Sequence, residues 1–244
     1  MNIKSLILFV TASASVAMLS GCGVTQNVQR GEGNTSQQVS DKAQNVSQQI
    51  PVIVDSGYTI QSNSIGVYGT YVAEVKNPNT SDVPLLASID VTVKNKDGVV
   101  LSNTQDYLPQ ITPGETIPVC NNYVDCKGDT EAIIELTVSG SNFIPESSAT
   151  LTNASQYKVD NVNEVGSKSD YSSAITGQVT NNSNIDATQI TVIVEYYKDN
   201  KLVGGDIGYV NNLPVGATGA FEINTSFRIV PDYDSYTVKA YRIA

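Results

Sequence analysis

Three cysteines carry most of the covalent chemistry that this chain of 244 residues could support. Cys22 ends the short run 19–22, in which Leu, Ser and Gly precede the thiol. An apolar segment, residues 5–18, comes before this run and follows the positive charge of Lys4. The segment is too short for an ordinary membrane-spanning helix, which needs about 20 apolar residues. Its length and its flanking charge are typical of a secretory signal peptide.

Residues 19–22 resemble the lipobox of bacterial lipoproteins. This resemblance implies that residues 1–21 are removed as a lipoprotein signal peptide and that Cys22 becomes the lipidated first residue. It would carry a diacylglyceryl group and an amide-linked acyl chain such as palmitate. Each buried methylene contributes about 0.8 kcal/mol, and two or three chains anchor a protein far more firmly than one. We therefore expect an extracytoplasmic protein, lipid-anchored to a bacterial cell membrane, with an ordinary signal peptide as the alternative.

Cys120 and Cys126 are the two remaining cysteines. An oxidising compartment and an even number of cysteines predict a structural disulfide between them. Two separate thiols are the main alternative. Their spacing differs from the Cys-x-x-Cys redox motif, and two thiols are too few ligands for a metal site.

The chain contains no histidine. This removes the commonest general base and the commonest transition-metal ligand. We therefore expect no enzymatic activity and no cofactor, although a pair of distant carboxyl groups of the glycosidase type stays open.

Oxygen ligands for calcium are the one metal-binding possibility that the sequence offers. Two clusters have suitable side chains: Asp160, Asn161, Asn163 and Glu164, and then Asp232 and Asp234. Neither cluster matches the twelve-residue loop of an EF-hand. Solvated turn residues are the commoner interpretation, so no metal site is predicted.

The charge balance is acidic, with 24 Asp plus Glu against 14 Lys plus Arg and a formal net charge of −10. Nucleic-acid binding requires clustered basic residues, as does docking on anionic lipid through a basic patch. Both functions are therefore disfavoured.

Composition changes sharply near residue 51. Residues 23–49 are rich in Gln, Ser, Asn and Gly, which predicts a disordered tether within residues 22–52. A short helix is an alternative there, because Val39, Ala43, Val46 and Ile50 have helical spacing. After Pro51, short alternating apolar runs are separated by turn residues. This pattern indicates an all-β fold.

The chain also contains an internal repeat. Four blocks match in the same order at offsets of 101–104 residues: 73–79 with 177–183, 89–93 with 190–194, 107–114 with 209–216, and 134–138 with 236–240. A repeat of this length indicates two copies of one domain. We therefore predict two tandem β-sandwiches, residues 53–148 and 153–244.

Alternate residues of a strand point to opposite faces, so the apolar spacing predicts each core. The first copy should bury Tyr71, Ala73 and Val75 against Ile89, Val91 and Val93. The second should bury Ile175, Gly177 and Val179 against Ile190, Val192 and Val194. Turns are expected at residues 96–98 and 198–200, with sharp corners at 113–114 and 214–216.

Tyr196 and Tyr197 are neighbours on one predicted strand, so their rings should point to opposite faces. One ring should lie in the core. The other could be an exposed contact for a partner or a glycan.

The residues 177–181, the strand 191–197 with its turn, and the corner 212–216 followed by Phe221 resemble FxLYC-type immunoglobulin-like domains of bacterial surface proteins. The first copy departs from this pattern, with Ala73 in place of the glycine. The resemblance implies immunoglobulin- or fibronectin-like β-sandwiches with no catalytic residues. A non-catalytic interaction or spacer module that contacts an envelope protein or glycan is therefore expected. A receptor lipoprotein that presents a solute, glycan or peptide to membrane machinery is the alternative.

Overall fold

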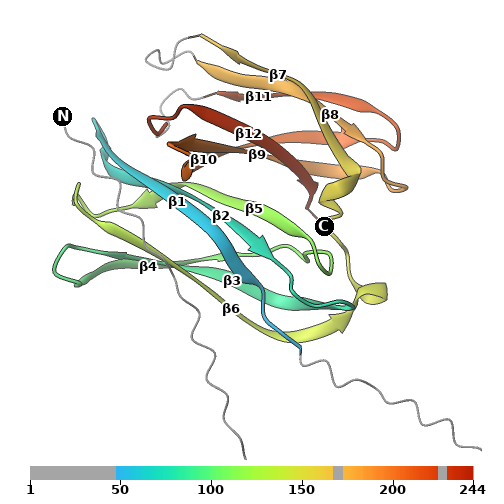
Figure 1. Ribbon diagram of the computed structural model, residues 1–244, viewed down its shortest axis with the longest axis horizontal. Coiled ribbons are helices and arrows are strands. Elements are labelled where there is room, and N and C mark those ends of the chain that lie inside the picture. The colour runs from blue at the N-terminus through green and yellow to red at the C-terminus, as the bar shows by residue number, and fades with distance from the viewer. Residues whose placement is uncertain (1–47, 167–172, 225–229, 244) are drawn as a thin grey trace, which may run out of the picture. The chain divides into compact units, whose positions relative to one another are not determined.

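A computed structural model of the protein describes residues 48–166, 173–224 and 230–243 (Figure 1). Cys22, the predicted signal peptide and most of the predicted tether lie outside these residues. Within them, no helix is long and apolar enough to cross a membrane.

The described residues form an all-β fold, as the alternating sequence predicts. Strands make up both halves of the sequence, joined by two short 3₁₀ turns. In the first half these are β1 (Val52–Asn63), β2 (Gly66–Lys76), β3 (Asp82–Lys94), β4 (Val100–Tyr107), β5 (Thr116–Asp125), β6 (Ile133–Pro145) and η1 (Glu146–Ser148). In the second half they are η2 (Ala154–Gln156), β7 (Tyr157–Val165), β8 (Ala174–Asn181), β9 (Ala187–Lys198), β10 (Lys201–Leu213), β11 (Thr218–Asn224) and β12 (Ser235–Arg242).

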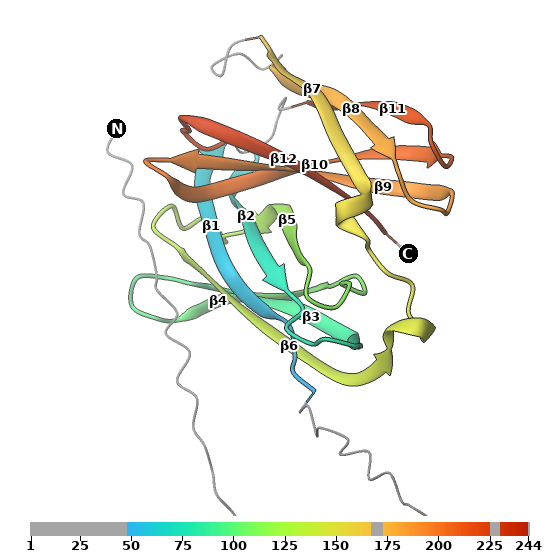
Figure 2. The same cartoon turned by 45° about the vertical axis from the view of Figure 1, so that its right-hand side comes forward.

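These strands form four antiparallel sheets of three strands each. Sheet A has the order β1-β2-β5, and sheet B has β4-β3-β6. In the second half, sheet C has the order β7-β8-β11, and sheet D has β10-β9-β12 (Figure 2). The second half therefore repeats the strand order of the first. Whether each half folds independently within the predicted boundaries 53–148 and 153–244 stays a prediction, because residues 48–244 form one compact unit.

The two predicted sets of core residues are buried in the structure. Tyr71, Ala73 and Val75 lie in one apolar cluster with Ile89, Val91 and Val93. Ile175 and Val179 lie in a second cluster with Ile190, Val192 and Val194. Gly177 packs directly against the ring of Phe221, because a Cβ at Gly177 would lie 2.5 Å from Phe221 Cζ.

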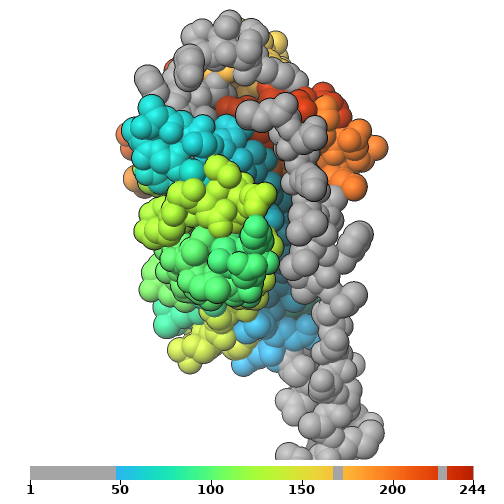
Figure 3. All heavy atoms as spheres, turned by 90° about the vertical axis from the view of Figure 1, so that its left-hand side faces the viewer, coloured from blue at the N-terminus to red at the C-terminus, as the bar shows by residue number. Residues whose placement is uncertain are grey.

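The predicted turns have the backbone conformations that their residues allow. Gly98, Asp199 and Asn200 have φ of 82°, 50° and 58°, which Gly, Asn and Asp tolerate best. At one end of the first half, the turn before β2, the β3–β4 turn and the segment after β5 lie together. The Ser102 hydroxyl donates to the carbonyl of Asp125 at 3.1 Å, and the Cys126 N–H donates to the carbonyl of Val67 at 3.1 Å. Figure 3 shows this end, with the three segments in cyan, green and yellow-green.

A buried asparagine closes the same corner in each half. The Asn77 Nδ2 donates to the carbonyls of Asp82 at 3.0 Å and Ile111 at 2.9 Å, and its Oδ1 accepts from the backbone N–H of Asn79. Asn181 repeats this arrangement with Ile185 and Leu213, each at 3.0 Å, and with the N–H of Ser183. Both side chains are fully buried. The repeat thus extends to individual hydrogen bonds.

The central strands β2 and β9 are buried on both faces, because each contains a run of consecutive buried residues. One face lies in its own core, and the other lies between sheets A and D. The Thr70 hydroxyl donates to the carbonyl of Gly205 at 2.8 Å, and the Thr59 hydroxyl donates to that of Val203 at 2.7 Å. Glycine permits this close approach, because a Cβ at Gly57 would lie 2.0 Å from the carbonyl oxygen of Leu202.

The predicted disulfide between Cys120 and Cys126 is not formed. Cys120 lies within β5, and Cys126 directly follows the end of that strand. Six residues of extended chain span about 20 Å at roughly 3.3 Å per residue. A disulfide needs Cα atoms about 4.4–6.8 Å apart. The cysteine count suggested a bond that the strand geometry forbids.

Candidate functional site

Two carboxyl groups and an ammonium group meet between sheets A and D. Glu74 projects from β2, whereas Glu195 and Lys239 project from the neighbouring strands β9 and β12. The Lys239 Nζ forms a short ion pair with Glu74 and lies 3.1 Å from Glu195 Oε2. The Thr237 hydroxyl donates to Glu195 Oε2 at 2.7 Å. We call these four residues the carboxyl cluster.

Burial governs the electrostatics of this cluster. Glu195 has 0% of its surface exposed. Burial and the hydrogen bond with Glu74 raise the pKa of Glu195 to about 7. Partial burial also acts to raise the pKa of Glu74, but the hydrogen bond with Glu195 and the Lys239 ammonium outweigh it and lower that pKa. Glu195 is therefore more readily protonated than an ordinary carboxyl group, whereas Glu74 is less so.

A pair of carboxyl groups with separated pKa values is also the signature of an acid–base active site. Such a site needs access for a substrate, and Glu195 has none. The cluster instead links the two halves through a charged hydrogen-bond network. Removal of one member of this network would leave a buried charge without its partner.

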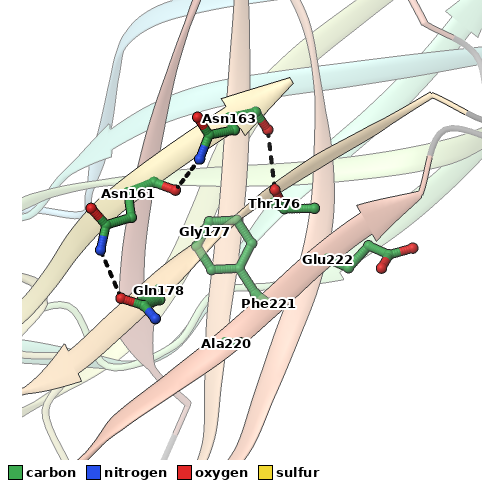
Figure 4. Close-up of a pocket in the computed structure, with 8 residues that line it drawn as sticks. All are labelled: Asn161, Asn163, Thr176, Gly177, Gln178, Ala220, Phe221 and Glu222. Atoms are coloured by element: carbon green, nitrogen blue, oxygen red, sulfur yellow. Dashed lines mark hydrogen bonds between the residues drawn. The ribbon is translucent and has the colours of Figure 1, made fainter. Parts of the chain in front are cut away.

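A shallow groove lies on the outer face of sheet C (Figure 4). Its volume is about 510 Å³, within the range of small-molecule sites. The lining residues come from β7, β8 and β11: Asn161, Asn163, Thr176, Gly177, Gln178, Ala220, Phe221 and Glu222.

A β-bulge places the amide side chains of this groove. The pairing of β7 with β8 shifts register between Asp160 and Asn163, and Asn161 has a left-handed φ of 52°. The Asn161 Nδ2 donates to Gln178 Oε1 at 2.8 Å, and the Asn163 Nδ2 donates to the carbonyl of Asn161 at 2.8 Å. These bonds hold three amides in a fixed row (Figure 4).

The two tyrosines differ in burial, and the role of Tyr197 as a contact stays a prediction. Tyr196 is the core ring, with no exposed surface, and it packs 4.6 Å from the ring of Tyr233. Tyr197 is partly buried and packs against the apolar cluster of the first half. The two rings point to opposite faces of β9, as predicted. The face that carries Tyr197 is covered by sheet A.

The residues considered for calcium are divided among other partners. Asp160 pairs with Lys158 at 3.0 Å, and Glu164 accepts a hydrogen bond from the Tyr233 hydroxyl at 2.8 Å. Asp232 and Asp234 both pair with Lys198, at 3.4 Å and 2.7 Å. Among the described residues, no group of three or more acidic or cysteine side chains could hold a metal ion.

Cys126 is a buried thiol rather than half of a disulfide. Burial, together with the carboxylates of Asp125 and Asp129, raises the pKa of its thiol to about 11. A thiol of this kind is a poor nucleophile at neutral pH, because the thiolate is the reactive form.

The carboxyl cluster was not predicted from the sequence. Glu195 stands between Val194 and Tyr196, and its alternation indicates only that it points away from the core of its own half. The strand 190–197 gives a weak indication of burial on both faces, because the residues that point to each face include large apolar side chains. Strands buried on both faces have this composition.

A serine–lysine spacing, Ser155 and Lys158, also escaped the sequence analysis. In catalytic pairs of this spacing the lysine assists the serine hydroxyl. Here the Lys158 ammonium pairs with Asp160 and is exposed, which does not suit a base.

We compared the chain with known protein families and with curated proteins, and neither comparison gave a match. The resemblance to FxLYC-type domains therefore rests on the residues quoted above, and the family stays a hypothesis.

Proposed function

We propose that this chain is a bacterial lipoprotein that displays a non-catalytic interaction module outside the cytosol. Acylated Cys22 anchors it to membrane lipid, and residues 23–49 act as the tether. The folded part contacts an envelope protein or glycan and carries two immunoglobulin-like sandwiches. Nucleic acid is not among its partners, since the formal net charge is −10.

The observation that carries this proposal is the burial of the two carboxyl groups of the cluster, Glu74 and Glu195. A pKa raised to about 7 would suit an acid–base catalyst, yet Glu195 has 0% exposed surface. The ion pairs and hydrogen bonds of the cluster join sheets A and D, and they make the folded part rigid. A rigid body held at a membrane suits a protein whose task is to present a surface.

A receptor that presents a bound ligand to membrane machinery is the second candidate. The groove on sheet C favours it, because its row of amides is held in place and faces outward. The two functions share the anchor and differ in whether this groove is occupied.

The replacement Cys22→Ser tests the anchor. We expect the variant to move from the membrane fraction to the periplasm or the medium. Cys120→Ser is the matched control and should remain in the membrane fraction. Equal membrane partitioning of Cys22→Ser and the wild type would refute the proposal.

A further inference from the structure

The face of sheet C that carries the groove is the counterpart of a docking face in the first half. The corner asparagines align β8 with β2, so Gln178 occupies the position of Glu74 and Thr176 that of Val72. In sheet A these positions contact the second half: Glu74 pairs with Lys239, and a Cβ at Gly205 would lie 2.8 Å from Val72 Cβ. This face of the fold is therefore a recognition surface within the molecule.

The groove differs from that docking face in polarity. Strand pairing places Cys120 opposite Val72 in sheet A, and Glu222 opposite Thr176 in sheet C. A hydroxyl and a carboxylate thus stand where the first half has a methyl pair and a thiol. The centre of a protein–protein interface is apolar and poor in charge. The groove therefore suits a polar occupant better than another sheet.

Strand addition is also disfavoured in the groove. β8 is the central strand of sheet C, and it pairs with β7 on one edge and β11 on the other. A peptide that binds as an extra strand needs an open strand edge. A ligand in the groove must be recognised by side chains.

Several polar atoms of the groove have no partner among the described residues. They are Asn161 Oδ1, Asn163 Oδ1 and Gln178 Nε2, since the side-chain hydrogen bonds of these residues use other atoms, and the Glu222 carboxylate. The lining combines these polar atoms with apolar surface, to which Gly177 and Ala220 contribute. A sugar ring has the complementary form, with hydroxyl groups at its rim and C–H groups on its faces.

The charge of the residues in and beside the groove favours a neutral sugar over an anionic one. Glu222 lines the groove, and Asp160 lies beside it. The nearest cation in β7, Lys158, is already paired with Asp160. An anionic ligand would meet repulsion with no free cation in this strand to offset it.

We propose that the groove on sheet C binds a neutral carbohydrate, whose hydroxyl groups are recognised by Asn161, Asn163, Gln178 and Glu222. The proposal rests on the displayed, non-catalytic role inferred above and names its ligand class. The groove is shallow and its one aromatic residue, Phe221, is 4% exposed, so affinity comes from hydrogen bonds without ring stacking.

Nuclear magnetic resonance of the full mature chain in detergent tests this site. The probes are maltotriose, cellotriose, mannotriose and chitotriose, with trigalacturonic acid as the anionic counterpart and trialanine as the peptide. At least one neutral trisaccharide should shift the side-chain amide signals of Asn161, Asn163 and Gln178 at millimolar concentration. Gln178→Ala and Asn163→Ala should each weaken binding about tenfold, the equivalent of one or two hydrogen bonds.

Gln105→Ala is the matched control, because Gln105 is an exposed amide on sheet B that bonds to Asp90 Oδ1 at 2.9 Å. It should bind like the wild type. The site is refuted if no neutral sugar shifts these signals, if the anionic sugar or the peptide binds more tightly, or if Gln178→Ala binds unchanged. Membrane partitioning of the same preparations separates the two proposals: an anchored chain that binds no sugar removes only the site.

Discussion

Glu195 is a fully buried carboxyl group whose pKa departs from its ordinary value. In the unfolded chain its pKa is 4.5, whereas burial and Glu74 raise its folded value to about 7. Between these values the folded state holds a proton that the unfolded state has lost. Stability is therefore greatest below about pH 4.5 for this group and falls as the pH rises through 7. Glu74 acts in the opposite sense, but at lower pH, because its folded pKa is lowered.

Glu195→Gln should remove this loss of stability. One pKa unit corresponds to about 1.4 kcal/mol, so the wild type should lose on the order of 2–3 kcal/mol of unfolding free energy between about pH 5 and 8. The variant should be nearly flat over that interval in urea titrations followed by circular dichroism. Glu146→Gln, at an exposed position, should keep the wild-type slope. A wild type whose stability rises over this interval would contradict the account.

A second prediction at the scale of single residues concerns the two cysteines. Intact mass analysis without reductant should find both Cys120 and Cys126 as thiols. Iodoacetamide should label Cys126 slowly in the folded protein and rapidly in denaturant, because burial raises its pKa to about 11. A folded protein two hydrogens lighter, with neither cysteine labelled after denaturation, would instead demonstrate a disulfide.

At the scale of the elements, each sharp corner depends on one asparagine. Asn181→Ala would leave the carbonyls of Ile185 and Leu213 and the N–H of Ser183 without their partners. A buried unsatisfied group costs about 1–3 kcal/mol, so we expect a loss of about 3 kcal/mol or more. The neighbouring Asn182→Ala should cost little, since Asn182 is exposed. Equal unfolding midpoints for the two variants would contradict this role.

The strands and their inward faces could be predicted because burial of one face imposes a period of two residues. Tyr71, Ala73 and Val75 follow that rule. The same rule could not reveal the contact between sheets A and D, because a Glu that points away from its own core is expected to meet water. Glu195 is buried by residues more than 100 positions away in the chain, as Glu74 illustrates. The groove was missed for a similar reason, since Asn161 and Asn163 face Gln178 only through a bulge.

At the scale of the whole molecule, the packing of sheet A on sheet D explains why residues 48–244 form one unit despite their internal repeat. Gly57 and Gly205 let the backbones approach, Thr59 and Thr70 donate across the contact, and the carboxyl cluster links the central strands. On the outward faces of sheets B and C, Thr92 and Thr176 occupy the positions that correspond to the buried Ile193 and Val72.

Calorimetry of the protein tests most directly whether the two halves behave as one body. An unfolding enthalpy of about 0.7 kcal/mol per residue near 60 °C gives roughly 140 kcal/mol for residues 48–244. We predict one transition whose van't Hoff enthalpy equals this calorimetric value. Two transitions, or one with a van't Hoff enthalpy near half of the calorimetric value, would show that the halves unfold separately and would contradict the account.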